Sequence, residues 1–190
     1  MRKLKLQVQM SVDGFVARPK GELDWMTWDW DDELKSYTKD LTDSFDSILL
    51  GRKMTDGFVS HWTNVVKSSK NPDYESAKIF VDTPKIVFSR TLDKSEWDNT
   101  EIAKGDYVQF INQLKEKPGK DIIVYGGAGF VSSLIGKNLI DEYHLFINPA
   151  AIGKGMTIFN TVDGNLNLKL VKSSAFDCGI VVNKYEPKTQ

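Results

Sequence analysis

The segment IIVYGGAGFVSSLI, Ile122–Ile135, carries the strongest fold signal in this chain. Three apolar residues and a tyrosine lead into Gly126-Gly127-Ala128-Gly129, and an amphipathic segment follows whose apolar face holds Phe130, Val131, Leu134 and Ile135. A strand that ends in glycines and continues as a helix suits phosphate binding, because the glycines let an anion approach the amides at the helix N-terminus. The segment therefore predicts a strand, a phosphate-binding turn and a helix.

Strand-like and helix-like patterns alternate outward from this segment. The periodicity predicts strands at Leu4–Ser11, Ser47–Gly51, Lys85–Ser89, Ile122–Tyr125 and Glu142–Asn148. It predicts helices over Asp31–Phe45, Lys53–Ser60, the stretch from Asn71 to Pro84, and Tyr107–Leu114. Near the C-terminus, Leu166–Ser173 and Gly179–Glu186 flank a tight turn and predict an antiparallel hairpin. This order predicts an α/β fold with a mixed, mostly parallel sheet covered by helices on both faces.

The composition indicates one folded domain over residues 1–190, with 41% hydrophobic and 27% charged residues. A net charge of −1 gives no basic field for nucleic acid, so that class of partner is not expected. One cysteine, Cys178, excludes an internal disulfide, and with two histidines the chain offers no metal site. The basic N-terminus alternates as a strand and no apolar run reaches membrane-spanning length, so we expect a cytoplasmic protein without membrane contact.

Two of the four arginines stand immediately after predicted buried strands. Arg52 follows the strand that ends at Gly51, and Arg90 follows Ser89. In mostly parallel sheets ligands bind at the carboxyl ends of the strands, so these side chains should share one rim with the glycine turn. A planar guanidinium suits bidentate phosphate binding, and a second phosphate beside the pyrophosphate points to NADPH rather than NADH.

A Rossmann-type NADH dehydrogenase is the alternative that the glycines raise. Its G-x-G-x-x-G fingerprint should open the first strand–helix unit, with an acidic residue closing the second strand. Here Gly127-Ala128-Gly129-Phe130-Val131-Ser132 lacks the third glycine and follows several strands, while Asp141 and Glu142 precede the next strand. The pattern therefore departs from that fold, although the alternative stays open at this point.

The chain resembles the dihydrofolate reductase-like superfamily, and within it the reductase domain of the bifunctional riboflavin-biosynthesis deaminase-reductase, as a stand-alone member. The segments that carry the resemblance occur in the family's order over nearly the whole chain: SVDGFVA, LLGRKMTDGF, KIVFSRT, IIVYGGAGFVSSLI and LIDEYHLFINPAAIGKGMTIF. The deaminase zinc signature cannot be built from one cysteine and two histidines. The resemblance implies a three-layer dihydrofolate reductase-like fold that binds NADPH across the strand ends.

The resemblance also assigns coenzyme-binding residues. The family's phosphate contacts match Arg52, Lys53 and Met54, flanked by Gly51 and Thr55, and its 2′-phosphate loop matches Ser89 and Arg90. The pyrophosphate turn matches the run Gly126–Val131. Val16 belongs to the loop over the nicotinamide, which is mobile in the family. The chain departs from the pattern at Met54, where a hydroxyl is common. Thr55 stands next to it, so that phosphate hydrogen bond is either displaced by one residue or lost.

The substrate side is expected in the tryptophan-rich segment GELDWMTWDWDD. Asp24 and Trp25 resemble a recurring pair in stand-alone relatives, and Trp25 could stack on a planar heterocycle; Trp28 and Trp30 could instead fill the core. Dihydrofolate reductases place a carboxylate early in the helix after the mobile loop, where it assists protonation of the substrate. Asp32 or Glu33 occupies the comparable place, although either could simply complement the helix dipole.

Together these features predict an NADPH-dependent oxidoreductase for a pterin-like, pyrimidine-like or ribosylamino-pyrimidine substrate, connected with riboflavin biosynthesis. Relatives are commonly homodimers, so the resemblance implies a homodimer here. The alternative from another class is a non-catalytic nucleotide-binding module that keeps the phosphate residues and lacks the proton donor.

Overall fold

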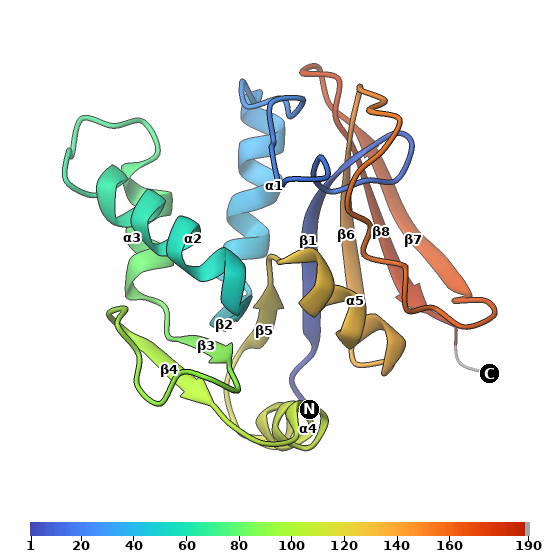
Figure 1. Ribbon diagram of the computed structural model, residues 1–190. Helices are drawn as coiled ribbons and strands as arrows, with labels where there is room; N and C mark the ends of the chain where they lie inside the picture. The colour runs from blue at the N-terminus through green and yellow to red at the C-terminus, as the bar shows by residue number, and fades with distance from the viewer. Residues whose placement is uncertain (189–190) are drawn as a thin grey trace.

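The computed structural model describes residues 1–188 and consists of an eight-stranded mixed sheet with helices on both faces (Figure 1). The strands are β1 (Leu4–Ser11), β2 (Phe45–Gly51), β3 (Lys85–Phe88), β4 (Thr100–Ala103), β5 (Asp121–Val124), β6 (Glu142–Asn148), β7 (Leu168–Ala175) and β8 (Val181–Pro187). The helices are α1 (Asp32–Asp43), α2 (Arg52–Val65), α3 (Tyr74–Asp82), α4 (Tyr107–Glu116) and α5 (Ala128–Gly136).

The strand order is β4-β3-β2-β5-β1-β6-β8-β7. Strands β1 to β6 pair in parallel, and β8 runs antiparallel to both β6 and β7. The predicted α/β class, mostly parallel sheet and C-terminal antiparallel hairpin are therefore confirmed. The glycine turn follows β5, a central strand, rather than opening the first strand–helix unit. This topology excludes the Rossmann alternative.

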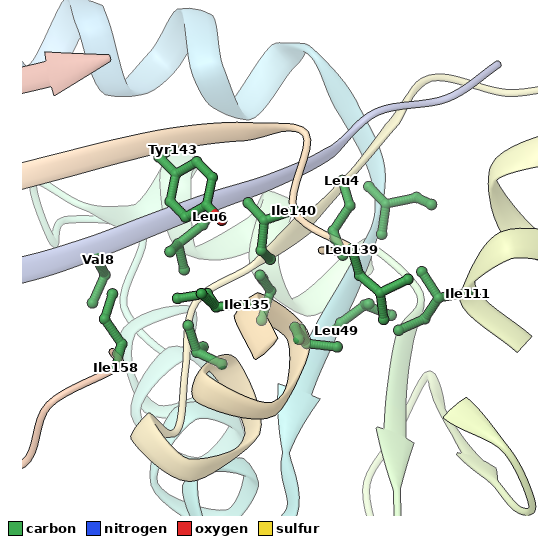
Figure 2. Packing of buried hydrophobic residues seen from close by; sticks show 14 of the residues in the cluster. Leu4, Leu6, Val8, Leu49, Ile111, Ile135, Leu139, Ile140, Tyr143 and Ile158 are labelled. Atoms are coloured by element: carbon green, nitrogen blue, oxygen red, sulfur yellow. The ribbon is translucent and has the colours of Figure 1, made fainter. Parts of the chain in front are cut away.

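Alternate residues of the central strands face two separate cores. Leu49, Ile122 and Val124 face α4 and α5, while Ile48, Leu50 and Ile123 face α1, α2 and α3. Figure 2 shows the first core, where Leu4, Leu6 and Val8 of β1 gather with Leu49, Ile111 and Ile135. Strands buried on both faces explain the unbroken apolar runs in the sequence. The three layers fix the strand ends rigidly, which makes the rim a defined place for a site.

Many helix and strand boundaries differ from the prediction by a few residues; helix α2, for example, covers Arg52–Val65 rather than Lys53–Ser60. Asp31 is the N-cap of α1 rather than its first residue, and its side chain accepts a hydrogen bond from the amide of Leu34. Phe45 was assigned to this helix, but the helix ends at Asp43 and Phe45 opens β2, where it is buried. The strand β4 was not predicted at all. Within residues 1–188, no helix is both long and apolar enough to cross a membrane.

Candidate functional site

The ends of three neighbouring strands bring the predicted phosphate residues to one rim. Strand β2 lies between β3 and β5, and all three run parallel, so their carboxyl ends lie side by side. Gly51 lies opposite Phe88 in the register, and the amide of Gly51 donates to the carbonyl of Gly126 (2.8 Å). Arg52, Ser89 and the glycine turn therefore start from adjacent points on the sheet.

The contact between Gly51 and the glycine turn requires a residue without a side chain. A Cβ on Gly51 would lie 2.8 Å from the backbone nitrogen of Gly127 and 3.0 Å from the Cβ of Phe130. The peptide bond between Gly126 and Gly127 is cis. Helices α2 and α5 thus begin in direct contact.

The N-termini of α2 and α5 both lack side-chain caps. Gly51 is the N-cap of α2 and Gly127 is the N-cap of α5, and neither can supply the oxygen that usually bonds the first amides. In α5 the first intrahelical bond runs from the amide of Val131 to the carbonyl of Gly127 (3.0 Å), so the amides of residues 128–130 precede it. An added Cβ on Gly129 would meet nothing within 4 Å, so there is open space beside this position in the first turn of α5. Two adjacent helix N-termini without caps are a candidate site for an anion, and this part of the rim is called the anion-binding surface below.

Cationic and hydroxyl residues follow the ends of the neighbouring strands β2 and β3. The Arg52 guanidinium lies 5.4 Å from the ring centre of Trp97, and its Nη1 donates to Asp56 Oδ2 (3.4 Å). Ser89 is nearly buried, and its Oγ accepts from the amides of Thr91 (3.2 Å) and Leu92 (3.0 Å). Because both lone pairs of the oxygen are used, the hydroxyl hydrogen of Ser89 is left to donate. Arg90 follows on the exposed side of the loop, and Lys53 is exposed in the first turn of α2.

Two of the predicted coenzyme residues, Thr55 and Val131, turn their side chains away from the anion-binding surface, and a third, Met54, covers part of it. The Thr55 side chain is fully buried and its hydroxyl donates to the carbonyl of Gly51 (3.2 Å), so it does not replace the hydroxyl missing at Met54. The Met54 sulfur covers the glycine turn from one side, 2.7 Å from where a Cβ of Gly126 would lie. Val131 is fully buried in the core. At Thr55 and Val131, only the backbone could contact a ligand.

Val16, the predicted nicotinamide contact, is buried at a junction of two loops. Its amide donates to the carbonyl of Met156 (2.8 Å), and the amide of Met156 donates to Ala17 (2.8 Å). A Cβ on Gly155 would lie 2.2 Å from the Ala17 carbonyl oxygen, so only glycine allows this approach. The loop after β1 is thereby tied to the loop after β6.

The tryptophan-rich segment divides between core and surface. Trp30 stacks on Phe146 at 6.1 Å and belongs to the core, whereas Trp28 is 65% exposed. Trp25 is half-buried, and its indole nitrogen is buried without a hydrogen-bond partner among the described residues. Asp24 is exposed and pairs with Arg18 (2.7 Å), whose guanidinium holds the pKa of that carboxyl below its usual value.

The Trp25–Trp30 segment is fastened to the rim by Asn148 at the end of β6. Its Oδ1 accepts from the amide of Thr27 (2.8 Å), and its Nδ2 donates to Gln9 Oε1 (2.7 Å). Asn148 is fully buried, so this anchor is shielded from water. Sequence reasoning missed Asn148, although an asparagine at the end of an apolar strand was a signal that could have identified it.

Asp32 and Glu33 are exposed in the first turn of α1. The preceding Asp31 accepts a hydrogen bond from the amide of Cys178 (2.9 Å), which places this end of α1 at the turn between β7 and β8. Strands β1 and β6 separate β8 from β5 in the sheet. The two carboxylates therefore do not join the glycine turn, and their role as proton donors stays a prediction.

A hollow of about 500 Å³ occurs at the opposite rim of the sheet, lined in part by Phe45, Lys78 and Pro84. It is broadly open to solvent, and Phe45 and Pro84 stand at the starts of strands, where parallel sheets do not bind ligands. Its side chains carry charges of both signs. The anion-binding surface at the other rim is therefore the better candidate. Within residues 1–188, no group of three or more histidine, cysteine or acidic side chains could hold a metal ion.

A buried polar chain lies between α1 and the sheet, away from this rim. The Tyr37 hydroxyl lies 2.5 Å from His144 Nδ1, and His144 Nε2 lies 2.7 Å from Glu142 Oε1. A neutral histidine satisfies both contacts, because Nδ1 then accepts from tyrosine while Nε2–H donates to the carboxylate. Burial lowers the pKa of His144, in agreement with this tautomer. Burial alone would raise the pKa of Glu142, but hydrogen bonds from His144 and Lys184 bring it below its usual value.

The free energy of unfolding is expected to fall as the pH drops from 7.5 to 5.5. The unfolded chain takes up a proton on its histidine near pH 6.5, whereas folded His144 resists it, so acid favours unfolding. The loss has an upper limit of about 1.4 kcal/mol per pH unit for this one proton. Urea denaturation of His144→Gln should show a shallower dependence of the free energy of unfolding on pH than wild type. Equal slopes for His144→Gln and wild type would contradict the assignment.

Comparison with known proteins finds matches over nearly the whole chain. Residues 2–182 match the family model for the RibD C-terminal domain. The uncharacterized protein YyaP of Bacillus subtilis (strain 168) is 36% identical over 183 residues, which cover 95% of this chain and 92% of that protein.

Two solved structures share the fold. A protein from Shewanella sp. PV-4 named for riboflavin biosynthesis superposes with a TM-score of 0.74 at 22% identity, over 100% of both chains. The Thermotoga maritima diaminohydroxyphosphoribosylaminopyrimidine deaminase/5-amino-6-(5-phosphoribosylamino)uracil reductase superposes with a TM-score of 0.71 at 19% identity; the match covers 98% of this chain and 57% of that one. These likenesses confirm the dihydrofolate reductase-like fold, and the family match extends over almost the entire sequence. The chain belongs to the RibD C-terminal domain family.

Proposed function

We propose that this protein is an NADPH-dependent reductase acting on a small heterocyclic substrate, with residues 1–190 forming one reductase-type domain. The observation that supports it best is the meeting of the α2 and α5 N-termini, both without side-chain caps, at the contact between Gly51 and Gly127. Each helix N-terminus carries roughly half a positive charge, which suits the doubly negative pyrophosphate of a dinucleotide. Family membership supports the same activity.

The residues at the rim fit NADPH in chemical type. The amides of Ala128 and Gly129 would bind the pyrophosphate, and Arg52, Ser89 and Arg90 would bind the phosphate on the adenosine ribose. NADPH, when bound, supplies the hydride. The chain's part is to bind and orient the coenzyme, to hold the substrate beside the Trp25 loop, and to deliver a proton, which we assign to Asp32 or Glu33 as a prediction.

The proposed substrate class is supported by analogy with a structural relative. The Thermotoga maritima protein is named as a reductase of a phosphoribosylamino-uracil. By analogy we propose a ribosylamino-pyrimidine or pterin-like substrate for this chain. The half-buried Trp25 supports this class, because its indole is flat and its N–H lacks a partner among the described residues.

A second candidate is a nucleotide-binding module without catalysis. Two observations favour it: the Met54 sulfur stands where a hydroxyl is common in the family, and the carboxylates of Asp32 and Glu33 lie away from the glycine turn. The cytoplasmic location and the homodimer stay predictions from the sequence.

Titration with NADPH and NADH tests the coenzyme, and NADPH oxidation tests the chemistry. We expect NADPH to bind at least tenfold more tightly than NADH, because only NADPH carries the phosphate for Arg52 and Arg90. Oxidation of NADPH should accelerate with the ribosylamino-pyrimidine or with dihydrofolate. Binding without turnover on a broad imine and carbonyl panel would favour the module, and equal affinity for NADH would contradict the proposal.

A further inference from the structure

The loop from Ser89 to Asn99, between β3 and β4, is fastened to α2 by one tryptophan. The Trp97 indole nitrogen donates to Asp56 Oδ1 (3.0 Å), and the other oxygen of that carboxylate accepts from Arg52 Nη1 (3.4 Å). The Arg52 guanidinium also lies over the Trp97 ring, 5.4 Å from its centre. The three side chains form a closed triangle, although 41 residues separate Asp56 and Trp97 in the sequence.

Each contact of the triangle is weak alone, and together they restrict one cation. Arg52 and Asp56 are four residues apart on the surface of α2, where an isolated ion pair contributes little. An arginine over a half-buried indole is likewise a modest attraction. Trp97 acts on Arg52 in two ways: its ring contacts the guanidinium directly, and its N–H holds the Asp56 carboxylate to which the guanidinium donates. The long side chain is thereby ordered before a ligand arrives, which lowers the ordering cost of binding.

The triangle also leaves Arg52 available for an anion. A guanidinium has five N–H donors, and the contact with Asp56 engages one of them at the long distance of 3.4 Å. The carboxylate is shared with the Trp97 N–H, and the indole ring offers no acceptor. Trp97 lies on the same loop as Ser89 and Arg90, so it ties that loop to the start of α2. It sets the spacing of the groups that would meet a ribose phosphate.

We propose that Trp97 is a specificity-determining residue: it positions the Arg52 guanidinium against the 2′-phosphate of the coenzyme and so sets the preference for the phosphorylated dinucleotide. The proposal rests on the proposed function, since it takes this rim to be the NADPH site. It assigns Trp97 a positioning role rather than a catalytic one.

The test compares adenosine 2′,5′-bisphosphate with adenosine 5′-phosphate, which differ by the 2′-phosphate alone. Isothermal titration of Trp97→Leu should show about a tenfold loss of affinity for the bisphosphate, or ~1.4 kcal/mol, with the monophosphate unchanged. Trp97→Phe keeps a ring beneath Arg52 and loses the N–H donor, so a smaller loss of about threefold is expected. Trp28→Leu, the same substitution at an exposed tryptophan, should bind both nucleotides as wild type does.

Asp56→Asn keeps the fold and tests the triangle from another side. It retains an acceptor for the Trp97 N–H but removes the charge that competes for Arg52, so it should bind the bisphosphate at least as tightly as wild type. Trp97→Leu with an unchanged preference, or with equal losses for both nucleotides, would overturn the inference while leaving the proposed function standing. A wild-type protein without preference for the bisphosphate would overturn the proposed function, and the inference with it.

Discussion

The double substitution Arg52→Gln/Arg90→Gln is expected to weaken NADPH binding by about 100- to 1,000-fold and to leave NADH binding nearly unchanged. A hydrogen bond to a charged group contributes about 1.5–3 kcal/mol, and two such groups are removed, so a loss of about 3–4 kcal/mol follows after partial screening by solvent. In the proposed site, NADH would not engage these side chains because it lacks the 2′-phosphate. The measurement is coenzyme fluorescence titration at fixed ionic strength.

Lys39→Gln is the matched control for this double variant. Lys39 is an exposed cation on α1 that pairs with Asp43, so its loss changes net charge without touching the rim. It should bind NADPH as wild type does. Equal losses of NADPH and NADH affinity in the double variant would show that the arginines act on the loops rather than on the phosphate. Higher salt should reduce the advantage of NADPH in wild type, because exposed cations are screened.

The substitution Gly51→Ala is expected to lower the free energy of unfolding by about 2 kcal/mol and to weaken coenzyme binding at least tenfold. The new Cβ would stand 2.8 Å from the nitrogen of Gly127, which is backbone and cannot rotate away. Overpacking of this kind costs about 1–3 kcal/mol. Relief requires α2 and α5 to separate at their N-termini, which widens the anion-binding surface. Urea denaturation measures the first effect and NADPH titration the second.

Gly57→Ala is the control for this prediction. Gly57 lies within α2, and an added Cβ there meets nothing within 4 Å. Alanine is the better helix former, so this variant should gain about 0.5–1 kcal/mol and bind NADPH normally. A Gly51→Ala protein as stable as wild type would mean that the two helices do not depend on this contact.

The layers of the fold could be predicted from the sequence because buried strands and helices each leave a recognisable pattern of apolar residues. Ile48 and Ile123 sit in apolar runs without a polar face, and such runs indicate central parallel strands. Strand β4 escaped prediction for the opposite reason. Thr100–Ala103 is four residues long, lies at the edge of the sheet and exposes Glu101. Its hydrophobicity therefore does not differ clearly from that of the polar loop before it. The predicted helix was too long by Phe45 because an aromatic residue at helical spacing is equally compatible with the start of a strand.

The site was predictable where it depends on strand ends and unpredictable where it depends on loops. Arg52, Ser89 and Gly126 each follow a buried strand, and parallel pairing brought them to one rim. The approach of Trp97 to Arg52 depends on the path of an irregular loop, for which no periodic signal exists. The tryptophan-rich segment shows the same limit, because the spacing of Trp28 and Trp30 does not indicate which one packs on Phe146.

The order of the strands has a consequence for how the chain acquires its structure during synthesis. Strand β1, which is synthesised before the other seven strands described here, is hydrogen-bonded to β5 and β6, both of which follow residue 120. Its apolar residues, Leu4 and Leu6 among them, therefore stay without their neighbouring strands until the ribosome has synthesised the chain beyond residue 120. A nascent chain carrying an unpaired hydrophobic strand for that long is a natural client for chaperones, and slowing translation before β5 should lower the yield of native protein.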